Sequence, residues 1–171
     1  MPYFVMAAIL IICCVSMPQA EASSSPRESL RGLPGVAVDI ENISKDAEAN
    51  GLTQSAIRKS VEHILRSNGV KVLTPQEKRT ISSEPALYVG VWSLKEGPEY
   101  SLCVEVNLTQ IVSLVSRSDF EIFVPTWRSM SLGRVGSHQL KDTIGVMIEP
   151  KIRAFANDFL AANRRPGLSS P

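Results

Sequence analysis

The chain has very little of the chemistry that builds metal sites or disulfides. Its 171 residues include three cysteines and two histidines. Cys13 and Cys14 fall in an apolar N-terminal stretch, which leaves Cys103 alone in the rest of the chain, without an internal disulfide partner. His63 and His138 are far apart and have no carboxylate or cysteine at ligand spacing, so we predict no metal site.

Catalytic motifs are missing as well. The serines lack a Gly-x-Ser-x-Gly elbow, and no motif places a base beside Cys103. Residues 133–136, Gly-Arg-Val-Gly, lack the third glycine and the Lys-Ser/Thr continuation of a phosphate loop. We therefore predict no catalytic residue, no cofactor and no enzymatic activity. Two alternatives stay open: a carrier of a small ligand or peptide, and a hydrolase with an unrecognised site.

The charge balance points away from nucleic acid. The formal net charge is +1, and the cations are scattered rather than gathered in a basic stripe. Hydrophobic residues make up 44% of the chain and charged residues 20%, which is typical of a globular protein. The length suits one domain.

The N-terminus has the pattern of an export signal. Residues 1–16 are almost all apolar and uncharged, but this run is shorter than the roughly 20 residues of a membrane span. Ala20-x-Ala22 predicts cleavage after Ala22, although no Lys or Arg precedes the apolar run. We expect a signal peptide at 1–22, a periplasmic or secreted protein, and no membrane span after cleavage. An uncleaved anchor and a lipoprotein are the alternatives.

After this segment we expect a polar linker at 23–32, a single domain at 33–163 and a polar tail at 164–171. Apolar alternation in 35–43 predicts a first strand, and Thr53 is suited to cap a helix over 54–67. A short strand at 70–73 follows, so the two strands should be parallel. Thr74 and Pro75 then open one or two helical turns.

The centre of the chain predicts a three-stranded antiparallel meander at 87–94, 100–115 and 120–130. In its middle strand, apolar residues alternate with polar ones, as in a strand with one buried face. Pro125 cannot donate to the ladder, so the third strand should be at an edge or bulged. Strict alternation puts Trp127 on the outer face, whereas one extra residue near Pro125 would return it to the core.

Ser137 should cap a long C-terminal helix, which Pro150 should kink or break between residues 147 and 151. The predicted fold is α+β, an α/β two-layer sandwich. Its elements follow the order β-α-β-(short α)-β-β-β-α, with a mixed five-stranded sheet and the two main helices on one face.

The remaining functional signal is the outer face of the meander. Along the middle strand this face changes from polar to apolar at Ile111 and Val115. Phe123 can join them, and so can Trp127 if no bulge intervenes. An apolar patch of this kind is either a docking surface or is covered by the N-terminal linker. We predict Ile111, Val115, Phe123 and Trp127 as a partner surface.

Four short stretches carry a family resemblance. They are Leu-Pro-Gly-Val at 33–36, Gly-Leu-Thr at 51–53, Thr126-Trp127, and Phe155-x-x-Asp158-Phe159-x-x-x-Asn163. With the order of elements, they resemble a set of exported bacterial proteins and the small α/β domain of envelope proteins such as the N-terminal domain of TolB, CsgG and LpoB. The resemblance implies a non-catalytic module that binds another envelope protein. This chain lacks the lipid-attachment cysteine that several of those proteins use.

Overall fold

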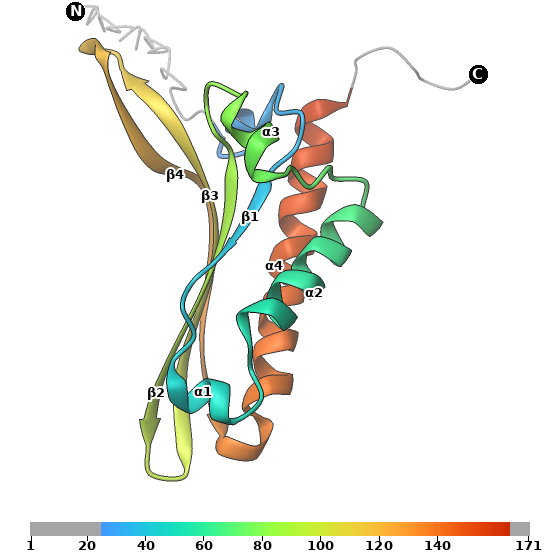
Figure 1. The fold of residues 1–171 in the computed structure, drawn as a ribbon, viewed down its shortest axis with the longest axis vertical. Helices are drawn as coiled ribbons and strands as arrows, with labels where there is room; N and C mark the ends of the chain where they lie inside the picture. The colour runs from blue at the N-terminus through green and yellow to red at the C-terminus, as the bar shows by residue number, and fades with distance from the viewer. Residues whose placement is uncertain (1–24, 165–171) are drawn as a thin grey trace, which may run out of the picture.

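The computed structural model describes residues 25–164, which form an α+β fold with one open sheet. The sheet is one layer, and helices α2 and α4 form a second layer on one of its faces (Figure 1). The predicted signal peptide and the tail beyond residue 164 lie outside the described residues.

Within residues 25–164 the sheet has four strands, in the order β1-β2-β3-β4. They are β1 (Ala37–Ile40), β2 (Ala86–Glu96), β3 (Glu99–Leu114) and β4 (Arg117–Gly136). β1 and β2 are parallel, and the meander β2-β3-β4 is antiparallel, as predicted.

The prediction of a fifth strand at 70–73 is wrong. This segment makes one isolated parallel bridge, between Val36 and Val72. The chain then turns into α3 (Pro75–Arg79), because Thr74 caps that helix and Pro75 occupies its first turn. The bridge confirms the predicted parallel direction, but none of the described residues, 25–164, forms a fifth strand at the sheet edge beyond Val36.

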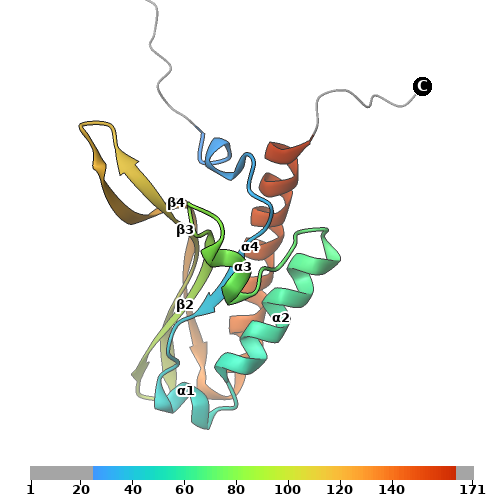
Figure 2. The same ribbon diagram turned by 45° about the horizontal axis from the view of Figure 1, so that its top comes forward.

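The first long helix agrees with the sequence pattern. After a short helix α1 (Lys45–Ala49), α2 spans Gln54–Ser67, and the Thr53 side chain accepts a hydrogen bond from the Ala56 amide. The predicted apolar stripe is buried: Ile57, Val61, Ile64 and Leu65. Helices α2 and α4 lie on the same side of the sheet in both views (Figure 1, Figure 2).

The C-terminal helix differs from the prediction at two points. Helix α4 spans Leu140–Asn163, because Ser137 begins a 3₁₀ turn, η2 (Ser137–Gln139), instead of capping the α-helix. The Ser137 hydroxyl donates to the Pro98 carbonyl at 2.9 Å, which ties the helix start to the β2–β3 turn. Pro150 lies inside α4 without breaking it, so the predicted break is wrong, whereas the alternative of a kink stays a prediction. Its exposed position keeps its ring out of the core.

The core lies between the inner face of the sheet and the two helices. Val104 and Val106 of β3, Ile57 and Val61 of α2, and Phe155 of α4 belong to one buried cluster. This confirms the predicted parity of β3, in which the even-numbered residues face the helices.

A β-bulge decides the position of Trp127. Leu108 pairs with Trp127 but Thr109 pairs with Pro125, so Thr126 is the extra residue on β4. Trp127 is 6% exposed, and its ring meets Phe155 edge-to-face at 5.2 Å. β4 is also the edge strand, as Pro125 indicated. Trp127 therefore belongs to the core and is removed from the predicted partner surface.

The segment expected to be a polar linker is part of the fold. It contains the short 3₁₀ turn η1 (Glu28–Leu30), whose Leu30 is fully buried. Arg27 forms a 2.7 Å ion pair with Asp158 of α4, and the other oxygen of that carboxylate accepts from the Trp127 indole at 3.0 Å. Asn163 donates to the Leu30 carbonyl at 2.9 Å. The residues that carry the family resemblance near the C-terminus thus hold the N-terminal segment in place.

Candidate interaction surfaces

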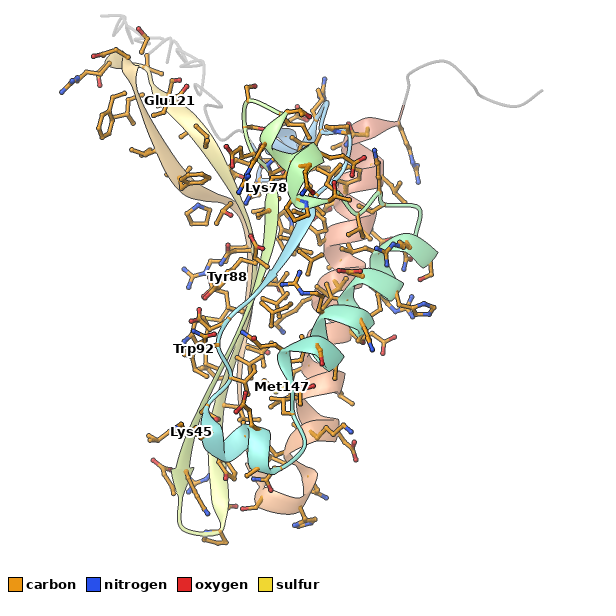
Figure 3. The ribbon with its side chains drawn as sticks, in the orientation of Figure 1. Lys45, Lys78, Tyr88, Trp92, Glu121 and Met147 are labelled. Carbon is orange, nitrogen blue, oxygen red and sulfur yellow. The ribbon has the colours of Figure 1, made fainter. Side chains whose placement is uncertain are left out.

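Within residues 25–164, no helix covers the face of the sheet opposite α2 and α4. The labelled side chains of Tyr88 and Trp92 lie on this side in Figure 3, away from the helices. The N-terminal segment 25–32 packs against α4 and the edge of β4, so it does not cover the open face. Of the two alternatives for the outer face, coverage by the described part of the linker is therefore excluded.

The first apolar area, called the open-face patch, consists of Trp92, Leu94, Met130 and Leu132, all exposed. The Trp92 ring lies on the backbone of Gly90, since a Cβ atom there would be 2.2 Å from Trp92 Cη2. Cys103 pairs with both Trp92 and Leu132 across the sheet and is half-buried between them. Trp92 and Leu94 alternate with the buried residues of β2, but strict alternation along the third meander strand puts Met130 and Leu132 on the inner face. The bulge at Thr126 brings these two residues to the open face, so the sequence pattern alone did not reveal the whole patch.

A belt of polar residues bounds the open-face patch. Glu105 accepts from Arg128 at 2.6 Å and from the Asn107 amide at 3.1 Å. Asn107 is buried, and its Oδ1 has no hydrogen-bond partner within residues 25–164. The belt separates the patch from a second apolar area nearer the end of β3.

This second area is the ribbon, residues 111–124, where β3 and β4 continue as a two-stranded hairpin. Figure 1 shows it in yellow and gold, projecting past the body of the domain at the upper left. Ile111 pairs with Phe123 on the outer face, while Val112 pairs with Ile122 on the other. Both faces therefore carry apolar side chains, and no helix of residues 25–164 covers either face (Figure 1).

The ribbon contains three of the four predicted partner residues. Ile111 is half-buried, Phe123 is 61% exposed, and Val115 is fully exposed in the turn between the strands. Phe120, which was not predicted, is also exposed, with the Arg117 guanidinium 5.6 Å from its ring centroid. The structure thus brings Ile111, Val115 and Phe123 together on one projecting element.

The base of the ribbon is fixed to the domain by Gln110. This buried side chain donates to the Ser29 carbonyl at 3.1 Å and to the Thr126 hydroxyl at 2.6 Å. Ser29 is in the N-terminal segment and Thr126 is the bulge residue. The direction in which the ribbon leaves the domain is therefore set by hydrogen bonds at its root.

Reactive chemistry is sparse within residues 25–164, where no three His, Cys, Asp or Glu side chains gather into a metal site. His63 and His138 are both exposed. Hydrogen bonds from Lys71 and Thr74 lower the pKa of Glu77 to about 2. Burial lowers the pKa of Lys151, whose ammonium group donates to the Ser131 hydroxyl at 2.7 Å.

The two shifted groups do not form an acid–base pair. Glu77 is on α3 and Lys151 on α4, and each has a structural partner that accounts for its position. None of the helices in residues 25–164 combines the length and apolar character needed to cross a membrane.

Comparison with known proteins gives no match to a family model, and no curated protein matches the sequence.

Proposed function

We propose that the protein is a non-catalytic binding or assembly module of the bacterial cell envelope, acting in the periplasm through contacts with another envelope protein. The ribbon is its contact element. The signal-like N-terminus and the resemblance described above support the location and the class of partner.

The observation that carries the proposal is the exposure of apolar side chains on both faces of the ribbon. A hairpin of two strands is marginally stable in water unless a further strand or helix covers it. Exposed apolar surface beyond scattered single residues is characteristic of interaction sites. Val115, Phe120 and Phe123 are exposed on an element that extends away from the core, where they contribute little to folding. Their burial against a partner would account for them.

The carrier and hydrolase hypotheses have weaker support. A carrier is expected to have a deep apolar pocket, whereas a cavity of about 560 Å³ between α2, α3 and β1 is lined largely by charged side chains. A hydrolase is expected to bring at least two polar groups with shifted pKa values together in one cleft. Glu77 and Lys151 do not meet that condition.

The test compares an apolar residue of the ribbon with an apolar residue of similar exposure on a helix. Phe123→Asp should weaken binding to a partner isolated from periplasm at least tenfold, because it places a charge in the contact. Val146→Asp on α4 is the matched control, since Val146 is 70% exposed and Phe123 is 61% exposed. Circular dichroism should show both variants folded. Loss of binding with Val146→Asp and retention with Phe123→Asp would place the contact on the helical side.

A further inference from the structure

A cavity of about 560 Å³ lies at the edge of the sheet opposite β4. Its walls come from β1, α2, α3 and the segment that leads into α3. Lys78, labelled on α3 in Figure 3, is one of the side chains that line it. The cavity is distinct from the ribbon and the open-face patch, so it is not part of the surface proposed above.

One wall of this cavity is the outer edge of β1, the edge that faces away from β2. The Ala37 amide donates to Pro85 and the Glu41 amide to Val89, so the odd-numbered residues bond toward β2. Successive backbone groups of a strand point to opposite edges. The amide and carbonyl groups of Val38 and Ile40 therefore point away from β2, toward the place where a fifth strand would continue.

No strand fills that place within residues 25–164. The Val36 carbonyl accepts from the Leu73 amide at 2.9 Å, after which the chain turns into α3. Further along β1, side chains replace a strand: the Val38 carbonyl accepts from Arg58, and the Ile40 carbonyl accepts from Gln54 at 3.3 Å. A strand edge that has side chains in place of a neighbouring strand can pair with another extended chain once those side chains move aside.

The charges around the edge favour an acidic ligand. Four cations line the cavity, and two of them are matched: Arg66 pairs with Glu62 at 2.9 Å and Lys78 with Asp39 at 3.6 Å. Arg58 is bound to a backbone carbonyl, and Arg79 has no ion pair within residues 25–164; their guanidinium groups suit carboxylates.

The backbone beside the cavity is strained. Glu84, which lines it, has a φ of 40°, and it is the one non-glycine residue with positive φ in the described part of the chain. Such conformations cost free energy and concentrate at functional sites. Glu84 is also the remaining carboxylate of the lining, which brings the balance to four cations and three acids.

From this geometry we infer that the edge of β1 binds an extended acidic peptide segment, which adds to the sheet as a fifth strand. A bare anion would leave the outward amide of Val38 unused, and a neutral peptide would leave the excess of one cation in the cavity lining unmatched. On binding, a peptide amide replaces Arg58 as the hydrogen-bond donor to the Val38 carbonyl. The released Arg58 guanidinium then pairs with a peptide carboxylate.

The test is selection of a random linear heptapeptide library on the purified protein, followed by NMR of the enriched peptides bound to it. Enriched peptides should carry Asp or Glu, and the largest amide shifts should fall at Val38 and Ile40. The double variant Arg58→Gln, Arg79→Gln should bind them at least tenfold more weakly. Lys59→Gln is the control, since Lys59 is an exposed cation of α2 outside the cavity lining.

Four results would overturn the inference. They are no enrichment, enrichment of peptides without acids, shifts confined to the open face or ribbon, and equal binding by inorganic phosphate at the same residues. The last would show an anion site in place of an added strand. Phe123→Asp should leave peptide binding unchanged, which separates this site from the proposed function.

Discussion

At the scale of single residues, Glu77 shows how local bonds set a charge state. Its carboxylate meets Lys71 Nζ at 2.7 Å and accepts from the Thr74 amide at 2.8 Å, closing the capping box of α3. These bonds favour the ionised form and hold the pKa of Glu77 at about 2, below its ordinary value of 4.5. The group is exposed, so the effect depends on the geometry of the cap and not on burial.

The pH dependence follows from this lowered pKa. Because the folded state binds the proton less tightly than the unfolded state, Glu77 stabilises the fold above pH 4.5 and loses that contribution as the pH falls toward 2. An NMR titration should find the pKa near 2, and Lys71→Met should raise it toward 4.5, since Lys71 is the largest cause. A pKa that stays at its ordinary value in the unaltered protein would contradict the geometry of the cap.

At the scale of elements, β3 combines a buried face with an ordered polar face. Val104 is fully buried, so Val104→Ala should lower the free energy of unfolding by about 1–3 kcal/mol. The sequence alone predicts almost no cost for Glu105→Ala, but Glu105 bonds both Arg128 and Asn107. We expect that change to cost about 1 kcal/mol. In urea denaturation, Val104→Ala should lower the free energy of unfolding more than Glu105→Ala does. The reverse order would mean that Glu105, and not Val104, lies on the buried face of β3.

Helix α4 continues through Pro150 despite the missing amide donor. A proline in a helix interior costs about 3 kcal/mol or more, because it removes a hydrogen bond and crowds the preceding turn. Pro150 is exposed, so few contacts offset that cost. Pro150→Ala should therefore stabilise the fold by about 1–3 kcal/mol and raise its melting temperature. Calorimetry that finds an unchanged or lower melting temperature would show that α4 relies on the proline.

Much of this architecture could be predicted from local patterns in the sequence. The cap and stripe of α2, the alternation of β3 and the bulge beside Pro125 each follow from a few neighbouring residues. The fifth strand could not be judged this way, because the apolar run at 70–73 resembles a strand. Whether such a run forms a ladder depends on where the chain goes next, and here Thr74 and Pro75 turn it into a helix.

The packing of the N-terminal segment was missed for a different reason. Leu30 is a single apolar residue among polar neighbours, so no periodicity marks it as buried. The residues that hold its segment are far away in the chain: Asp158 pairs with Arg27 at a separation of 131 residues, and Asn163 binds the Leu30 carbonyl at a separation of 133. The resemblance motif did contain these residues, but their spacing gave no indication that they hold the N-terminal segment.

At the scale of the whole molecule, the ribbon results from a mismatch of lengths. The 16 residues of β3 extend about 50 Å at the rise of a strand, whereas the 24 residues of α4 span about 36 Å as a helix. The longest helix therefore cannot cover the longest strands, and the ends of β3 and β4 project beyond the core (Figure 2). The open-face patch and the ribbon together form an apolar surface on the side of the sheet opposite α2 and α4, where a partner can bind.

The most direct test of the central claim is photo-crosslinking in living cells. Benzoylphenylalanine at Phe123 should give a discrete crosslink to one envelope protein, identified by mass spectrometry, because the ribbon is in the contact. The same probe at Val146 should give none, since Val146 is at least as exposed, at 70% against 61% for Phe123, but lies on the helical side. If the probe at Val146 gave a crosslink and the probe at Phe123 gave none, the result would contradict the account and would place the functional surface on α4.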